Sequence, residues 1–154
     1  MAGGRDLERD PPGKLQNVHA LVVDDHDDAR ELLTLFLEKA GAKVTQADSV
    51  RAAVRAISTA NVQVLVSDIG MPDEDGYDLI RRVRGDAALV CVRGIPAIAV
   101  TAFSAAADRR KAIAAGFQEH LPKPCDSRHL VEVVARLVHA AGEAAPGEGP
   151  VKSS

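Results

Sequence analysis

Short runs of apolar, mostly β-branched residues alternate along the chain with stretches that have the periodicity of amphipathic helices. The runs fall at residues 18–23, 43–47, 62–67, 95–100 and 117–121. After the first run, apolar side chains recur at helical spacing until Gly41, the predicted stop, and Asp27 or Asp28 is the predicted cap. Strands this uniformly apolar are covered by helices on both faces. The alternation therefore predicts an α/β fold with a doubly wound, five-stranded parallel sheet.

The compact part of the chain is expected to span residues 18–140, a typical size for one domain. Residues 1–17 and 141–154 lack periodicity and contain several glycines and prolines, so we predict a flexible N-terminal tail and a flexible C-terminal tail. The later helices are expected to start at Ser49, to span residues 76–84, to run from a Ser104 cap to Gly116, and to start near Asp126 or Ser127.

Composition excludes several classes of function. Aromatic residues make up 3% of the chain and its net charge is −3, so it lacks the stacking platforms and the basic surplus that bind nucleic acids. No apolar run approaches the roughly 20 residues that span a bilayer, and the first ten residues carry charges where a signal peptide is apolar. Cys91 and Cys125 lack metal-binding spacing and are predicted to be reduced thiols. We therefore expect a cytoplasmic protein with no nucleic-acid or membrane partner.

Polar side chains follow four of the predicted strands, at the edge where parallel sheets bind ligands. They are Asp24 and Asp25, then Asp68, Thr101 and Lys123. With right-handed crossovers the first and third strands are neighbours, so three carboxylates converge. Two like charges about 4 Å apart repel by about 4 kcal/mol at an effective dielectric constant of about 20, and a divalent cation would relieve this repulsion. An all-oxygen ligand set suits Mg²⁺ better than Zn²⁺.

These residues lie in short motifs that follow one another in a fixed order. The motifs are Leu21-Val-Val-Asp-Asp25, Ser67-Asp-Ile-Gly-Met-Pro-Asp-Glu-Asp-Gly76, Thr101 after the fourth strand, and Leu121-Pro-Lys-Pro124. Together they resemble the signature of a two-component response regulator receiver domain over residues 18–140. The resemblance implies the flavodoxin-like (βα)5 receiver fold, and it extends to the receivers of hybrid histidine kinases.

The resemblance implies a role for each of these residues. Asp68 would be the nucleophile that accepts a phosphoryl group, because a carboxylate needs no base to activate it. The Mg²⁺ ligands would be Asp25 and Asp68 directly, Asp24 through water, and the backbone carbonyl of Gly70. Lys123 would neutralise the oxygens of the phosphoryl group during an in-line transfer.

Two further positions of the family's pattern concern the switch that follows phosphorylation. Thr101 would be that switch, because its hydroxyl can move to hydrogen-bond the phosphorylated carboxylate. His120 stands where the family usually has a Tyr or Phe that turns inward, so this chain departs from the pattern there. The family's Lys-Pro peptide, here Lys123-Pro124, is usually cis and aims the lysine into the site. His26 stands where the family often has Glu and is placed to tune access to the metal.

The resemblance also implies partners on both sides of the reaction. The phosphoryl donor would be a histidine kinase or a phosphotransfer protein, and a monomer or weak dimer would signal to a downstream protein target. The chain would not be an enzyme beyond catalysing its own phosphorylation and dephosphorylation. An aspartyl-phosphate phosphatase is disfavoured, because it needs a second Asp where this chain has Gly70. The alternative function is a phosphate-independent protein-interaction module on the same fold.

Overall fold

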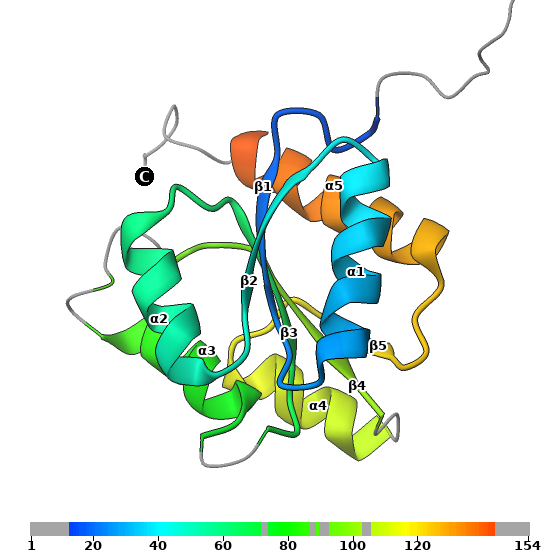
Figure 1. Ribbon diagram of the computed structural model, residues 1–154. Coiled ribbons are helices and arrows are strands. Elements are labelled where there is room, and N and C mark those ends of the chain that lie inside the picture. Colours follow the sequence, from blue (N-terminus) through cyan, green and yellow to red (C-terminus); the bar gives the residue numbers. More distant parts are fainter. Residues whose placement is uncertain (1–12, 72–73, 87–88, 90–92, 103–105, 144–154) are drawn as a thin grey trace, which may run out of the picture.

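The computed structural model describes residues 13–71, 74–86, 89, 93–102 and 106–143. Five strands and five helices alternate along this part of the chain, as the sequence predicts (Figure 1). The strands are β1 (His19–Val23), β2 (Lys43–Ala47), β3 (Val64–Asp68), β4 (Ala97–Thr101) and β5 (Glu119–Pro122). The helices are α1 (Asp27–Lys39), α2 (Val50–Thr59), α3 (Gly76–Gly85), α4 (Ala106–Ala115) and α5 (Ser127–Glu143).

The strands form one parallel sheet in the order β2-β1-β3-β4-β5. β1 pairs with both β2 and β3, so the chain reverses its direction across the sheet after the second strand. In this register Val22 lies beside Val66, and Leu65 lies beside Ala97. The reversal places the carboxyl ends of β1 and β3 next to each other, where doubly wound sheets bind ligands. The predicted doubly wound, flavodoxin-like topology is therefore confirmed.

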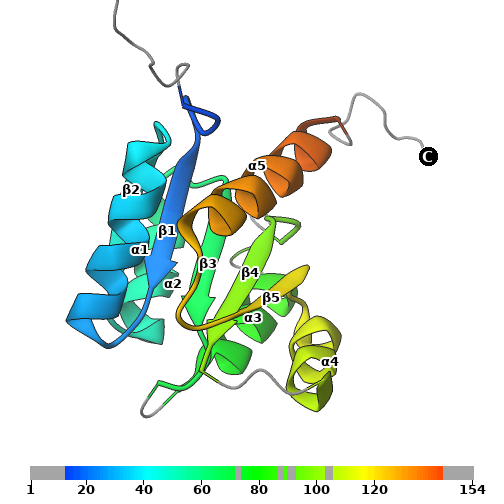
Figure 2. The same ribbon diagram turned by 90° about the vertical axis from the view of Figure 1, so that its right-hand side faces the viewer.

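Two apolar layers cover the two faces of the sheet. α1 and α5 contribute Leu37 and Leu130 to the layer that includes Val22 of β1. α2, α3 and α4 form the other layer, in which Ile80 packs with Leu65 of β3. Figures 1 and 2 show α1 and α5 on one side of the sheet and α2 and α3 on the other. Alternate strand residues enter opposite layers, so both faces are buried, which explains the continuous apolar runs.

Folded structure extends beyond residues 18–140 at both ends. The sequence predicts a flexible tail for residues 1–17, but Leu15 is fully buried and its N–H donates to the carbonyl of Ala40 at 2.9 Å. A single apolar residue among polar ones has no periodicity, so the pattern could not reveal this packed turn. α5 continues to Glu143. Among the described residues, no helix combines the length and the apolar character needed to span a membrane.

The helices begin close to the predicted positions, but one of the predicted capping residues differs from the observed one. α1 has His26 as its N-cap without a side-chain cap hydrogen bond, so the prediction of Asp27 or Asp28 as the cap is wrong. Both aspartates lie in the first turn, where their negative charges interact favourably with the positive end of the helix dipole. Ser49 caps α2 as predicted, accepting from the Ala52 N–H at 3.1 Å. The predicted Ser104 cap and Cys91 lie outside the described residues.

Candidate functional site

The carboxyl ends of four strands bring the predicted site residues to one edge of the sheet. Asp24 and Asp25 directly follow β1, and Asp68 is the last residue of β3. Thr101 ends β4 and Lys123 directly follows β5. The sequence places Asp68 and Thr101 one residue beyond their strands, whereas the structure includes them in the strands. This difference leaves them at the same edge.

Lys123 joins two of the three carboxylates. Its Nζ lies 2.7 Å from Asp24 Oδ2 and 3.2 Å from Asp68 Oδ1. Asp24 is fully buried and Asp68 is 4% exposed, so neither carboxylate is well solvated. The peptide bond from Lys123 to Pro124 is cis. One ammonium group therefore faces several carboxylates, and the cluster keeps a net negative charge.

The pKa shifts at this site follow from burial and from neighbouring charges. Burial and the Asp24 carboxylate raise the pKa of Asp68, and the nearby Lys123 ammonium only partly offsets this effect. Burial alone would lower the pKa of Lys123, but its contacts with Asp24 and Asp68 outweigh burial and raise this pKa. Lys123 therefore stays charged, whereas ionised Asp68 costs the folded protein free energy.

Asp68→Asn is expected to raise the free energy of unfolding at neutral pH when a chelator is present. The pKa of Asp68 in the folded protein is raised above its ordinary value of 3.8. The protonated carboxyl therefore stabilises the folded protein below pH 3.8, and this stabilisation is lost as the pH rises through the folded-state pKa. The advantage of Asn should therefore shrink as the pH is lowered toward 3.8. Urea unfolding across this pH range tests the prediction, with exposed Asp48→Asn as the control. An equal gain at every pH would contradict it.

The donor set fits a divalent cation. Asp24, Asp25, His26 and Asp68 each offer a ligand atom, and these atoms lie within 4.8 Å of one another. Asp25 Oδ1 is buried and has no hydrogen-bond partner in the described part of the chain, which is costly for a carboxylate oxygen. Gly70 lies exposed in the loop that follows β3, two residues after Asp68. A cation could satisfy the orphaned oxygen and relieve the repulsion among the carboxylates.

Thr101 and His120 face the same side of the sheet. Ala99 belongs to the layer of α2, α3 and α4, and it lies beside His120 in the register of β4 and β5. Thr101 follows two residues after Ala99, so its side chain points to this layer too. Thr101 is 1% exposed and His120 is 7% exposed. The imidazole at the expected switch position is therefore turned inward.

His120→Phe is expected to raise the free energy of unfolding by about 1 kcal/mol. The Nε2 of His120 is buried and has no hydrogen-bond partner among the residues that the structure describes, and Phe removes this polar atom while filling similar space. Thermal and urea unfolding would measure the gain, with the exposed His129→Phe as a control. A loss of stability would mean that the imidazole has a stabilising partner.

Gly76 supports the site in a way that sequence reasoning missed. A Cβ at this position would lie 2.5 Å from the carbonyl oxygen of Asp68 and 2.9 Å from the Cα of Ile69. The Gly76 N–H also donates to the Ile69 carbonyl at 2.9 Å. The first residue of α3 is thus pressed against the end of β3, and the capping box of Asp75 and Asp78 fixes the start of the helix. The sequence signal that could have indicated this close contact is a glycine directly after an acidic N-cap residue, here Gly76 after Asp75.

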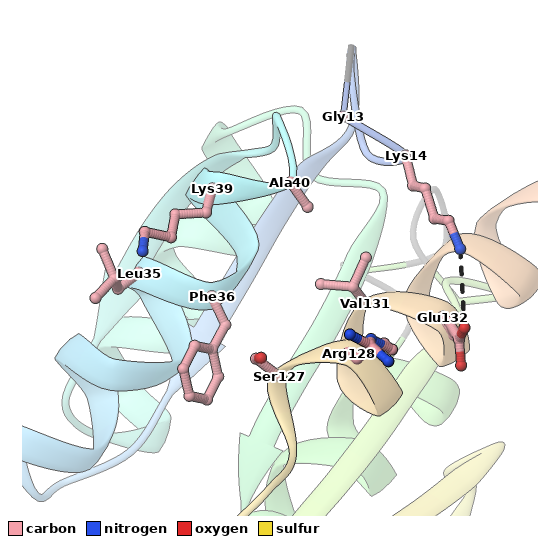
Figure 3. A pocket seen from close by; sticks show the side chains of 10 residues that line it. All are labelled: Gly13, Lys14, Leu35, Phe36, Lys39, Ala40, Ser127, Arg128, Val131 and Glu132. Carbon is pink, nitrogen blue, oxygen red and sulfur yellow. Dashed lines mark ion pairs between the residues drawn. The ribbon is translucent and has the colours of Figure 1, made fainter. Parts of the chain in front are cut away.

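Two hollows differ in their relation to this edge of the sheet. One of about 340 Å³ adjoins the site and is lined by Gly70, Thr101 and Tyr77 among others. Another of about 420 Å³ lies between α1 and α5, with Phe36 and an ion pair of Lys14 and Glu132 at 3.8 Å in its lining (Figure 3). None of the described residues that line the larger hollow is a predicted site residue.

The doubly wound sheet with an acidic cluster at its strand ends is the architecture expected of a receiver domain, and comparison with known proteins shows the family. The sequence pattern of the response regulator receiver domain matches residues 20–135. This chain belongs to the response regulator receiver domain family, and it is a receiver domain of a two-component system.

Individual relatives support this membership. The chain is 41% identical over 120 residues to an uncharacterized 14.6 kDa protein in the sodA1 3′ region of Leptolyngbya boryana, covering 78% of this chain and 89% of that protein. It is 33% identical over 121 residues to the transcriptional regulatory protein GltR of Pseudomonas aeruginosa, covering 79% of this chain but 49% of GltR. The signal receiver domain of a signal transduction histidine kinase from Syntrophus aciditrophicus has a similar structure. Its TM-score is 0.73 at 28% identity, with 89% of this chain and 99% of that chain covered.

Proposed function

We propose that Asp68 accepts a phosphoryl group from a phosphohistidine of a histidine kinase or phosphotransfer protein. The observation that supports this proposal is the convergence of Asp24, Asp25 and Asp68 around Lys123 at one edge of the sheet. Mg²⁺ would be held by these three aspartates and the carbonyl of Gly70. The donor and the receiver would meet in the cytoplasm, and the phosphorylated receiver would act on a downstream protein.

The transfer is a displacement at phosphorus. An oxygen of the Asp68 carboxylate forms the new P–O bond while the P–N bond to the donor histidine breaks, and the protonated ring leaves as neutral imidazole. Lys123, 3.2 Å from Asp68 Oδ1, neutralises the phosphoryl oxygens as they approach. A bound Mg²⁺ would supply further positive charge for the same oxygens. The buried surroundings of Asp24 and Asp68 strengthen these interactions.

The response would pass from Thr101 toward α4. The Thr101 hydroxyl is proposed to move to the phosphorylated carboxylate, and His120, whose side chain faces the same layer, would adjust to that movement. The surface around α4 and β5 would then present the signal to a partner. The chain would do no other chemistry than gaining and losing this phosphoryl group.

The intact mass after incubation with phosphoramidate tests the proposal, because the P–N bond of this donor resembles that of phosphohistidine. We expect a single phosphoryl adduct that requires Mg²⁺ and is absent from Asp68→Asn. Asp48→Asn, which removes an exposed carboxylate, should still form the adduct. If folded wild-type protein with bound Mg²⁺ forms no adduct, the proposal is wrong and a phosphate-independent interaction module becomes the better account.

A further inference from the structure

The imidazole of His26 lies beside the carboxylates of the site. Its Nδ1 is 3.5 Å from Asp24 Oδ1 and 3.3 Å from Asp25 Oδ1. The backbone N–H of His26 donates to Asp24 Oδ1 at 2.9 Å, and the residue is the N-cap of α1 in extended backbone. These contacts hold the backbone next to the acidic pair. The side chain is 71% exposed, so the ring can turn without disturbing the core.

The nitrogen of His26 is close enough to share a cation with the carboxylates. One atom from each of Asp24, Asp25, His26 and Asp68 belongs to a set in which all atoms lie within 4.8 Å of one another. Around a six-coordinate ion with bonds of about 2.1 Å, neighbouring ligand atoms are about 3 Å apart and opposite ones about 4.2 Å apart. The set is therefore slightly wider than a bound shell, and small side-chain movements would close it. The buried Oδ1 of Asp25, which accepts no hydrogen bond from the residues that the structure describes, offers a ligand on the same side.

We infer that His26 is an additional metal ligand, and that it makes this site prefer first-row transition-metal ions such as Ni²⁺ over Mg²⁺. Carboxylate, carbonyl and water oxygens suit Mg²⁺, whereas imidazole nitrogen suits Ni²⁺ and Zn²⁺. Compared with a site of three carboxylates alone, a site with an added imidazole therefore binds Ni²⁺ and Zn²⁺ more tightly, whereas its affinity for Mg²⁺ changes little. This inference rests on the proposed function, because it uses the same carboxylates.

A structural role for His26 would have a different consequence. If the imidazole merely steadied Asp24 and Asp25 through its contacts with them, its removal would disturb the carboxylates for every cation. The affinities for Mg²⁺ and Ni²⁺ would then fall together. A ligand role changes the ratio of the two affinities, so this ratio is the decisive quantity.

Calorimetric titration of the full chain with Mg²⁺ and with Ni²⁺ measures this ratio. In the wild type we expect Ni²⁺ to bind more tightly than Mg²⁺. Removing a residue that hydrogen-bonds to a metal ligand commonly weakens metal binding about 10- to 100-fold. Removing the ligand itself, as in His26→Ala, should therefore weaken Ni²⁺ binding at least about tenfold. Mg²⁺ binding should be nearly unchanged. His26→Glu, which supplies oxygen in place of nitrogen, should favour Mg²⁺ rather than restore Ni²⁺ binding.

Exposed His129 provides the matched control. His129→Ala should leave both affinities unchanged, and an equal loss of Ni²⁺ binding in this variant would overturn the inference by placing Ni²⁺ at surface histidines. Equal weakening of both metals in His26→Ala would also overturn it. Mg²⁺ binding without a preference for Ni²⁺ would overturn this inference and leave the proposed function intact. If neither metal binds the wild type, both fail.

Discussion

Lys123→Met is expected to lower the free energy of unfolding by about 3 kcal/mol when divalent cations are chelated. The variant leaves the fully buried Asp24 and the nearly buried Asp68 without the ammonium group that lies 2.7 and 3.2 Å from them. Removing one partner of a buried ion pair leaves an uncompensated charge, which costs 3–5 kcal/mol in typical cases. The lower end applies because the Lys123 side chain is 23% exposed and water screens it in part.

Urea unfolding with a chelator and with millimolar Mg²⁺ would test this prediction. Mg²⁺ should stabilise the Lys123→Met variant more than the wild type, because the variant has more negative charge to neutralise. The exposed Lys39→Met is the control and should unfold like the wild type in both conditions. The account fails if Lys123→Met is as stable as the wild type with the chelator, or if Mg²⁺ stabilises both proteins equally.

Gly76→Ala is expected to cost a similar amount, about 3 kcal/mol, because a methyl group cannot fit without moving backbone. The new Cβ would stand 2.5 Å from the carbonyl oxygen of Asp68 and 2.9 Å from the Cα of Ile69. Neither atom belongs to a side chain that could turn away. The helix start or the strand end must shift, and this shift would carry Asp68 with it. We therefore expect weaker Mg²⁺ binding as well as lower stability.

Gly85→Ala is the matched control for Gly76→Ala, because Gly85 is the last residue of the same helix. In the described part of the chain, apart from its neighbours and the backbone of its own helix, no heavy atom lies within 4 Å of its ideal Cβ. Ala in place of Gly in a helix stabilises it by about 0.5 kcal/mol, so this variant should unfold slightly later than the wild type. Chemical unfolding and Mg²⁺ titration of both variants would measure the two effects. If Gly76→Ala behaves like Gly85→Ala, Gly76 does not position the site.

The sequence predicts this fold well because its signals are local and repeated. Each strand is a short apolar run, and each helix has one apolar face, so the order of elements follows from periodicity alone. Gly41 and Gly116 end α1 and α4 in left-handed backbone, with φ of 103° and 129°, as their positions in the pattern indicate. The strand ends then place the polar residues at one edge without any knowledge of side-chain contacts.

Features that depend on tertiary contacts could not be predicted in the same way. Leu15 lies in a polar segment, and its burial depends on the end of α1. The arginine-rich end of α3 is typical of a solvated face, yet Arg84 donates to the carbonyl of Gly116 at 2.8 Å and to that of Ile95 at 2.6 Å. The inward turn of His120 likewise depends on neighbours that are distant in sequence. Periodicity reports which face is apolar, whereas these contacts depend on shape.

The chemical identity of the phosphorylated residue tests the central claim most directly. Borohydride reduces an acyl phosphate to an alcohol, so a phosphorylated aspartate becomes homoserine. Wild-type protein would be treated with phosphoramidate and Mg²⁺, reduced, and cleaved after arginine. The peptides between Arg9 and Arg30 and between Arg55 and Arg81 would then be sequenced by mass spectrometry. The account predicts homoserine at position 68 and unchanged aspartate at positions 24 and 25. Homoserine elsewhere, or none in a protein that carries the phosphoryl mass, would contradict it.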